Sequence, residues 1–220
     1  MSKNIVAFIP LKLNNQRLPG KNLKKFSNGV PLVNYILNSL SSVEGISNVY
    51  VYCSDDSVVD YLPDHVTFLK RSPSLDTDST LINDVMACFA QDVVADAYIM
   101  LHATAPFLKP ESIQASINAL SGDVFDSVLT VQRKQEFLWL DTSAPSNYSP
   151  ESIPRTQDLD PYFVETTGLY GYTFNLAQKG RRIGDNPRLI VVDAIEATDI
   201  NNAVDFAMAN ALIEAGAIHE

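Results

Sequence analysis

Short runs of apolar, β-branched and aromatic residues recur along the chain and predict the strands of a β-sheet. Each run is bounded by turn-forming or polar residues, which is typical of strands in a folded domain. A sheet that contains these runs would bury most of their side chains between layers of helices. The predicted strands are residues 4–9, 48–53, 66–69, 97–101, 127–131, 170–174 and 189–192.

Apolar residues at every fourth position between these runs predict amphipathic helices. Strand and helix patterns alternate, as they do when helices cover both faces of a parallel sheet. We therefore expect an α/β protein of the three-layer α/β/α, Rossmann-like type with a mostly parallel sheet. The three clearest helical sets are Leu32, Ile36 and Leu40, then Leu81, Val85 and Phe89, and finally Val204, Met208 and Leu212.

One segment, approximately residues 132–160, breaks this alternation. It contains three prolines, several Ser and Asn residues, and the aromatic side chains of Phe137, Trp139 and Tyr148. The pattern predicts a small protruding insertion within a single domain that spans residues 1–220. Aromatic residues on a projecting hairpin are more often buried in a subunit interface than stacked on a substrate, although both interpretations fit the pattern.

The composition excludes several classes of partner. The 220 residues are 46% hydrophobic, enough for one buried core. A formal net charge of −10 argues against a nucleic-acid partner, because such proteins present an extended basic face. The N-terminal apolar run is broken by Pro10 and is too short for a signal peptide or a membrane span. We therefore expect a cytoplasmic protein without membrane contact.

The positive charge of the chain is concentrated in the loop after the first strand. No Asp or Glu precedes Glu44, whereas Lys12, Arg17 and Lys21 all lie in this loop. Ligands of open α/β sheets bind beyond the carboxyl ends of the strands, where the loop lies. The chain contains neither a dinucleotide fingerprint nor a Walker loop, so side chains would have to hold the phosphates. Spacing alone leaves a solvated basic loop as an equal alternative.

The chain resembles a known family in the segments that begin with this loop. It reads Ile-Pro at residues 9–10, Arg-Leu-Pro-Gly-Lys-Asn at 17–22 and Gly-Val-Pro-Leu at 29–32. These segments resemble the N-terminal signature of the CMP-sugar synthetases, namely the acylneuraminate cytidylyltransferases (CMP-N-acetylneuraminate synthetases) and the related CMP-Kdo synthetases. The similarity covers nearly the whole chain and continues through residues 71, 78–80, 101–107, 167–170 and 196–201.

The resemblance implies a fold of the nucleotide-diphospho-sugar transferase type and a specific reaction. It implies transfer of CMP from CTP to the anomeric hydroxyl of a sialic-acid-like (nonulosonic) sugar acid, with release of pyrophosphate and assistance from Mg²⁺. It also implies a homodimer in which the insertion is the dimerisation element. Two alternatives remain open: a CMP-Kdo-type synthetase that acts on another 2-keto sugar acid, and a catalytically impaired nucleotide-binding homologue.

The resemblance further implies the roles of individual residues. The candidate catalytic residues, which would bind the phosphates, are Lys21, Arg17 and Lys12. The candidate nucleotide-binding residues are Leu11, Asn22, which would contact the cytosine, Arg71, Asp78 and Thr80. The candidate residues for the acidic keto sugar are His102, Thr104, Arg155 and Tyr170. The candidate Mg²⁺ ligands are Asp199 and Asn201.

Three of these positions depart from the family pattern. Lys12 stands in place of an arginine, which keeps the charge and loses the bidentate fork. Asn201 stands in place of an aspartate, so a metal site there would have one negative charge fewer. His102 stands in place of a glutamine. These departures are the reason to retain the impaired homologue as an alternative.

Two residues also have alternative interpretations. His102 ends a predicted strand and has a side chain suited to a general base, yet a hydrogen-bonded or substrate-contacting histidine is the favoured interpretation. Asp199 precedes the last predicted helix, where an aspartate also stabilises a helix start. Arg155 has a guanidinium shaped for a sugar-acid carboxylate. The sequence predicts no convincing general base.

Overall fold

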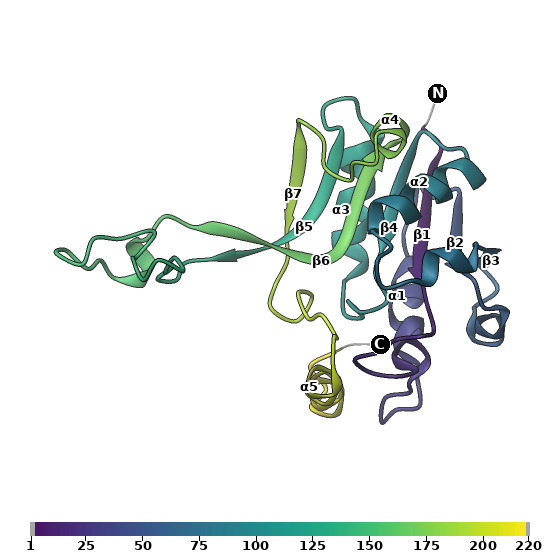
Figure 1. The fold of residues 1–220 in the computed structure, drawn as a ribbon, viewed down its shortest axis with the longest axis horizontal. Helices are drawn as coiled ribbons and strands as arrows, with labels where there is room; N and C mark the ends of the chain where they lie inside the picture. Colours follow the sequence, from purple (N-terminus) through teal and green to yellow (C-terminus); the bar gives the residue numbers. More distant parts are fainter. Residues whose placement is uncertain (1–2, 219–220) are drawn as a thin grey trace.

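The computed structural model describes residues 3–218 and contains one seven-stranded sheet (Figure 1). The strand order is β3-β2-β1-β4-β6-β5-β7. β6 pairs antiparallel with both of its neighbours, and the other neighbouring strands pair in parallel, which confirms the mostly parallel sheet. The strands are β1 Ile5–Leu11, β2 Asn48–Cys53, β3 Val66–Lys70, β4 Ala97–Leu101, β5 Ser127–Lys134, β6 Tyr162–Thr173 and β7 Pro187–Val191.

Helices cover both faces of the sheet, as the three-layer prediction requires. α1 and α3 pack with one buried cluster, and α2 and α4 pack with a second cluster on the opposite face. None of the helices among residues 3–218 is long and apolar enough to cross a membrane. The helices are α1 Leu32–Leu40, α2 Ile82–Asp92, α3 Pro110–Ser121, α4 Phe174–Gln178 and α5 Ala203–Glu214.

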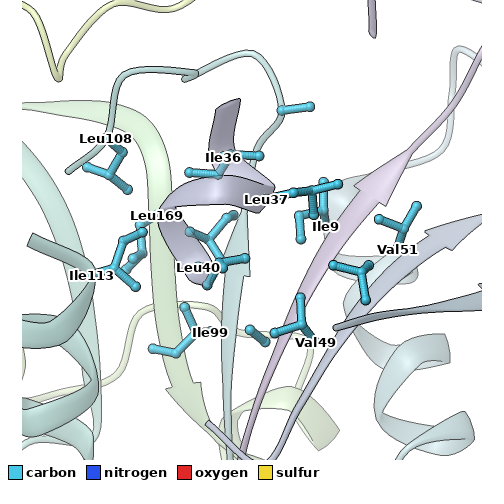
Figure 2. Close-up of a cluster of buried hydrophobic side chains, with 14 of the residues drawn as sticks. Ile9, Ile36, Leu37, Leu40, Val49, Val51, Ile99, Leu108, Ile113 and Leu169 are labelled. Carbon is cyan, nitrogen blue, oxygen red and sulfur yellow. The ribbon is translucent and has the colours of Figure 1, made fainter. Parts of the chain in front are cut away.

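The first core forms because β-branched strand residues meet aliphatic helix residues across one face of the sheet. Figure 2 shows Ile9, Val51 and Ile99 of the sheet near Ile36 and Leu40 of α1. All five side chains are almost completely inaccessible to solvent. Each such burial stabilises the fold by about 1.5–3 kcal/mol. This core fixes the positions of the strand ends that carry the site.

The second core is aromatic. The rings of Phe8 in β1 and Phe89 in α2 stack with centroids 3.9 Å apart. Tyr98, Tyr170 and Tyr172 complete this cluster and are fully buried. Large planar side chains fill the wider space on this face of the sheet and contribute edge and stacking contacts. Tyr170 lies at the end of this aromatic cluster that is next to His102.

The structure corrects the predicted face of the last helix. We expected Val204, Met208 and Leu212 to form its buried stripe, but Val204 and Met208 are 67% and 65% exposed. Phe206 and Ala209 are buried instead, in a cluster with aromatic residues of the N-terminal loop. The fourfold apolar spacing fits both faces of this alanine-rich helix, and tertiary packing selects between them.

Two further differences concern the second half of the chain. α3 is not among the helical sets that the sequence pattern predicted most clearly. β6 begins at Tyr162 rather than near residue 170. It is longer because β5 and β6 continue to pair beyond the sheet, from Val131 opposite Glu165 to Lys134 opposite Tyr162.

This extension forms a projecting arm that we define as residues 132–164. Figure 1 shows the β5–β6 ribbon leaving the sheet and ending in an irregular tip. The predicted insertion at about 132–160 lies within the arm. Several of its large apolar side chains are exposed, among them Trp139 (61%) and Ile153 (67%), whereas Leu159 is buried. Exposed apolar groups gathered on one projection are a feature of surfaces that contact another protein.

Candidate active site

The candidate site lies at the carboxyl ends of the parallel strands. The loop after β1 and the start of α5 meet at this end of the sheet, far apart in sequence and close in space (Figure 1). In this loop Gly20 adopts φ 66°, in the left-handed region that glycine reaches without strain. The turn at Gly20 starts a short 3₁₀ helix, Lys21–Leu23, whose first two residues are buried.

Lys21 joins the β1 loop to the segment before α5. Its Nζ donates a hydrogen bond of 2.7 Å to the carbonyl of Ile200, and the lysine is only 7% exposed. Burial lowers the pKa of Lys21, an effect opposed by the nearby Asp199 carboxylate and reinforced by Arg17. Lys21 therefore lies within electrostatic range of Arg17 and Asp199. The structure therefore brings three predicted residues of two segments together.

The segment that contains Asp199 and Asn201 is held by its backbone. Ile200 buries its side chain, and its N–H donates to the carbonyl of Thr104 at 2.8 Å. Asp205 accepts hydrogen bonds from the N–H groups of Asn201 and Asn202, while Asn202 caps α5. Asp205 is therefore committed to the helix start, and Asp199 is not the cap. This removes the structural alternative considered for Asp199.

The side chains of Asp199 and Asn201 lie on the same side of the segment. The Asn201 amide donates to Asp199 Oδ2 at 2.6 Å. The other oxygen, Asp199 Oδ1, is shielded from solvent and has no hydrogen-bond partner among the described residues. A buried carboxylate oxygen without a partner is costly, so it marks a position where a ligand is expected.

These two residues fit Mg²⁺ of the kind that binds together with a nucleotide. Mg²⁺ favours one or two protein oxygens and takes its remaining ligands from phosphates and water. Within residues 3–218, no group of three or more His, Cys, Asp or Glu side chains is arranged to hold a metal. Asp199, with the Asn201 side-chain amide beside it, fits the sparse donor set that a nucleotide-bound ion requires.

A pocket of about 200 Å³ lies beside Lys12 of the β1 loop. Its lining includes the predicted residues Lys12, Arg71, Thr80 and His102. A larger cavity of about 730 Å³ lies between α1 and residues 106–111, and none of the predicted site residues lines it. Size alone therefore does not identify the site. The smaller pocket has the polar groups that a nucleotide needs.

Several polar atoms of the residues predicted to bind the nucleotide have no hydrogen-bond partner within the described part of the chain. They include Asn22 Oδ1 and Arg71 Nε. Asn22 uses its amide N–H to hold the carbonyl of Lys12 at 2.9 Å, and Arg71 pairs with Asp76 at 2.6 Å. Each side chain is thus fixed by one contact while another polar atom remains available to a ligand.

Asp78 contacts the basic loop rather than lying apart from it. Its carboxylate pairs with Lys12 Nζ at 3.3 Å and also accepts a hydrogen bond from Gln16. Both partners of this ion pair are partly exposed, so the pair adds little stability. Asp78 is the counter-ion of Lys12 in this structure, and a bound phosphate would compete with it.

His102 follows β4 and lines the pocket. Burial, with a smaller contribution from the positive charge of Arg182, lowers the pKa of His102 to about 4. Its Nε2 has no hydrogen-bond partner among the described residues. The imidazole is neutral near pH 7 and is a weak base, which favours hydrogen bonding over general-base catalysis.

The smaller pocket is not lined by three of the predicted residues, namely Leu11, predicted for the nucleotide, and Thr104 and Arg155, predicted for the acceptor. Leu11 is 1% exposed and packs in the first core, so its side chain has no access to a ligand. Thr104 is partly exposed and holds the Asp199 segment through its carbonyl. Arg155 lies on the arm and forms a two-point ion pair with Asp158 at 2.7 and 3.0 Å. Within one chain, Arg155 does not join the other site residues.

The sequence interpretation missed two residues beside Tyr170. The Arg182 guanidinium lies over the Tyr170 ring, 3.9 Å from its centroid. Glu165 accepts a hydrogen bond of 2.6 Å from the Tyr170 hydroxyl and pairs with Arg182 at 3.5 Å. Arg182 follows Arg181 on a polar turn near Gly184 and is not among the site residues predicted from the sequence. Arg182 is distinguished by its contacts with Tyr170 and Glu165, which are distant in the sequence, so residue spacing does not reveal it.

Thr167 is a further residue of note at the same edge. Its φ of 57° is unusual for a β-branched residue and indicates local backbone strain. It lies in an irregularity of the β5–β6 pairing, supported by the hydrogen bond from Thr166 to Thr130 Oγ1 at 2.7 Å. The carbonyl of the next residue, Gly168, accepts from the N–H of His102. The strained segment thus sets the position of the His102 backbone.

The fold and the site together define an α/β protein with a mostly parallel sheet and a group of basic side chains beyond the carboxyl ends of its strands. The model of a family described as "Cytidylyltransferase" matches residues 6–207, so the chain belongs to that family. This finding confirms the resemblance stated from the sequence.

Individual relatives are similar at low identity over most of the chain. The chain is 26% identical to CMP-N,N'-diacetyllegionaminic acid synthase of Legionella pneumophila over 96% of each sequence. It is 24% identical to N-acylneuraminate cytidylyltransferase A of Danio rerio over 94% of this chain. The chain spans about half the length of that protein and of the Oncorhynchus mykiss enzyme.

Solved structures share the fold. A CMP:2-keto-3-deoxy-manno-octonic acid synthetase complexed with CTP superposes with a TM-score of 0.72 at 18% identity, covering 97% of this chain and 99% of that one. The 4-diphosphocytidyl-2C-methyl-D-erythritol synthase of Anaerococcus prevotii superposes with a TM-score of 0.65 at 13% identity, covering 96% of each chain. Both likenesses confirm the predicted α/β fold.

Proposed function

We propose that this protein transfers CMP from CTP to the anomeric hydroxyl of a sialic-acid-like, nonulosonic sugar acid and releases pyrophosphate. The observation that carries the proposal is the convergence of Lys21, Arg17 and Asp199 from two distant segments. This arrangement combines cations for phosphates with a carboxylate for the accompanying metal. Family membership supports the nucleotidyl transfer, and the names of the relatives support a sugar acid as acceptor.

In the proposed reaction, the acceptor hydroxyl attacks the α-phosphorus of CTP. The bond from that phosphorus to the bridging oxygen breaks, pyrophosphate leaves with the electron pair, and the hydroxyl proton passes to water. Lys12, Arg17 and Lys21 stabilise the charge on the phosphates and on the leaving group. Asn22 and Arg71 hold the nucleoside part through their available polar atoms.

Mg²⁺, when bound by Asp199 and Asn201, would neutralise negative charge on the triphosphate. The residues of the chain prepare this position before the ion arrives. Lys21 and Thr104 fix the backbone of Ile200 from both sides, so the Asp199 carboxylate is aimed without help from the nucleotide. Preorganised charge of this kind costs no reorganisation during the reaction.

His102, Thr104 and Tyr170 are the proposed acceptor-side residues within the body of the domain. The neutral His102 imidazole is available to hydrogen-bond a sugar hydroxyl through Nε2. Tyr170 lies next to it, with ring centroids 6.4 Å apart. The sugar itself remains the open part of the proposal: legionaminate, sialate and Kdo-type acids all occur in the names of the relatives.

We include a homodimer in the proposal, formed through the arm. Phe137 and Trp139 are 38% and 61% exposed on it, and burial of such side chains between two chains would stabilise the association. In such a dimer the arm of one chain is available to the site of the other. Arg155 would then act as an acceptor-binding residue across the interface.

The direct test is pyrophosphate release from CTP and Mg²⁺ with a panel of acidic sugars. The panel contains N-acetylneuraminate, N,N'-diacetyllegionaminate, pseudaminate and 3-deoxy-manno-octulosonate, and product masses identify the CMP-sugar. We expect release with at least one nine-carbon acid. Turnover of 3-deoxy-manno-octulosonate alone would support the Kdo-type alternative. Silence across the panel despite tight CTP binding would overturn the proposal.

One observation favours an impaired homologue as the second candidate. The Asn201 amide donates to Asp199, where a second carboxylate would instead add charge for the metal. Asn201→Asp tests this point by calorimetry with CTP and Mg²⁺. We expect the substitution to tighten Mg²⁺ binding by about tenfold, because it adds one negative charge. No change in metal-dependent binding or in rate would contradict the placement of the metal.

A further inference from the structure

The turn after α4 brings a guanidinium group to the acceptor side of the site. The carbonyl of Gly180 accepts a hydrogen bond from the Asn83 side chain at the start of α2. Ile82 and Val85 of the same helix line the pocket that contains His102. The turn from Gly180 to Arg182 is therefore fixed against a wall of the candidate site.

The Arg182 guanidinium is held in position by two contacts. It lies 3.9 Å above the ring of Tyr170, and its Nη2 lies 3.5 Å from Glu165 Oε2. Tyr170 is fully buried and itself hydrogen-bonded to Glu165, so the platform beneath the guanidinium is rigid. A cation over an aromatic face is favourable and keeps the guanidinium plane oriented.

The guanidinium retains capacity for another anion. An arginine has five N–H donors, and the single carboxylate paired with Arg182 in the described part of the chain is 3.5 Å away. The Arg182 side chain is 30% exposed, which leaves it accessible to a solute. Its charge also lowers the pKa of His102, so it lies within electrostatic range of the pocket. A carboxylate is the group that such a fork binds best.

The chemistry of the acceptor places a carboxylate near this point. In a 2-keto sugar acid the carboxylate is bonded to the carbon that bears the reacting hydroxyl. A side chain that binds it must therefore lie close to the site of phosphoryl transfer. Arg155 is on the arm and already has two hydrogen bonds to Asp158.

We propose that Arg182 binds the carboxylate of the acceptor sugar acid, with Tyr170 as its platform and Glu165 as its positioning residue. The inference rests on the proposed function, because it specifies a contact to the proposed acceptor. It assigns acceptor recognition to a residue of the same chain that provides the nucleotide site. The arm then adds contacts to an acceptor that is already anchored.

Steady-state kinetics of Arg182→Ala and Arg182→Gln test the inference. The sugar acid of the panel with the fastest pyrophosphate release serves as the probe, at saturating CTP and Mg²⁺. We expect KM for the sugar acid to rise about 30-fold, the loss of one charge-assisted pair, while KM for CTP stays within about twofold. Arg182→Lys should recover part of the loss because it restores charge without the fork.

Arg181→Ala is the matched control. Arg181 precedes the tested residue, is exposed and pairs with Asp185 on the surface, so its removal should leave both KM values unchanged. The methyl ester of the same sugar acid gives a second readout. Wild-type protein should strongly prefer the free acid, and Arg182→Ala and Arg182→Gln should lose most of this preference.

The outcomes separate the inference from the proposed function. If wild-type protein turns over no sugar acid, the proposed function fails and the inference fails with it. If wild-type protein is active and both Arg182 variants retain its KM and its preference for the free acid, the inference alone fails. A parallel rise in KM for CTP and for the sugar acid would indicate a structural role and would also overturn it. A loss of preference for the free acid in Arg155→Ala, with none in the Arg182 variants, would assign the carboxylate to the arm.

Discussion

The proposed nucleotide end and the proposed acceptor end of this site are built in different ways. The nucleotide end joins the β1 loop to the α5 start through the buried hydrogen bond from Lys21 to Ile200. The acceptor end gathers Tyr170, Arg182 and Glu165 from a strand and a surface turn, while Arg155 lies on the arm. Under the proposed function, activation of CTP would depend on residues anchored in the core of the fold, whereas acceptor choice would depend on a surface turn and on the arm.

The largest expected effect comes from breaking the nucleotide end at Asp199. Asp199→Ala removes the carboxylate proposed to hold Mg²⁺ and should lower kcat/KM by about a thousandfold, since charge neutralisation at phosphates contributes several kcal/mol. Pyrophosphate release measures the effect. Asp185→Ala, an exposed carboxylate paired with Arg181, should behave like wild type. Full activity in the Asp199 variant would place the metal elsewhere.

Lys21→Met should produce the next largest effect. Methionine keeps most of the buried chain length and removes the charge, so phosphate stabilisation is lost while packing is largely retained. We expect kcat/KM to fall by about a hundredfold. Thermal unfolding shows whether the fold survives, and Lys25→Met, an exposed lysine of the same loop, is the control. If the variant loses activity only because it no longer folds, Lys21 has a structural role and not the proposed role in phosphate stabilisation.

His102 lines the pocket and makes the stability of the fold depend on pH. Its pKa is lowered to about 4, below the value of 6.5 expected in the unfolded chain. Between these values the unfolded state binds more protons, so the folded state loses stability as pH falls. Between pH 8 and pH 5 we expect this histidine to account for about 2 kcal/mol of lost stability.

The measurement is urea unfolding of wild type and His102→Gln at both pH values. The variant should lose less stability than wild type over this interval, because glutamine does not titrate. His65→Gln serves as a histidine-substitution control outside the pocket. Parallel pH profiles for wild type and His102→Gln would show that His102 is more hydrated than its burial indicates.

The nucleotide end was largely predictable from the sequence. The β1 strand, the acid-free loop and the position of Lys21 follow from local patterns and from a signature that the loop carries almost intact. The structure adds the hydrogen bond from Lys21 to Ile200, which links residues far apart in the chain. The sequence pattern also does not distinguish Asp199 from Asp205, since both lie near the start of the same helix. The structure shows that Asp205 is the one that accepts hydrogen bonds from the backbone N–H groups there.

The acceptor end was less predictable, for a physical reason. Arg182 lies on a polar turn whose composition resembles any solvated loop, and its role depends on the ring of Tyr170 beneath it. The buried face of α5 was predicted wrongly because its alanines and alternating apolar residues allow two packing orientations. The periodicity of apolar residues predicts that a helix forms, but it does not predict which side of the helix packs against the rest of the protein.

The difference between the two ends is tested most directly by CTP binding to a protein without the arm. Lys134 and Tyr162 are opposite each other in the ribbon, so residues 135–161 can be replaced by an Asn-Gly hairpin turn. We predict that the dissociation constant for CTP with Mg²⁺, measured by calorimetry, stays within about twofold of the wild-type value. Pyrophosphate release should fall by about a hundredfold as the second chain is lost. A large loss of CTP affinity in a folded, shortened protein would contradict the account, because the nucleotide end would then depend on the arm.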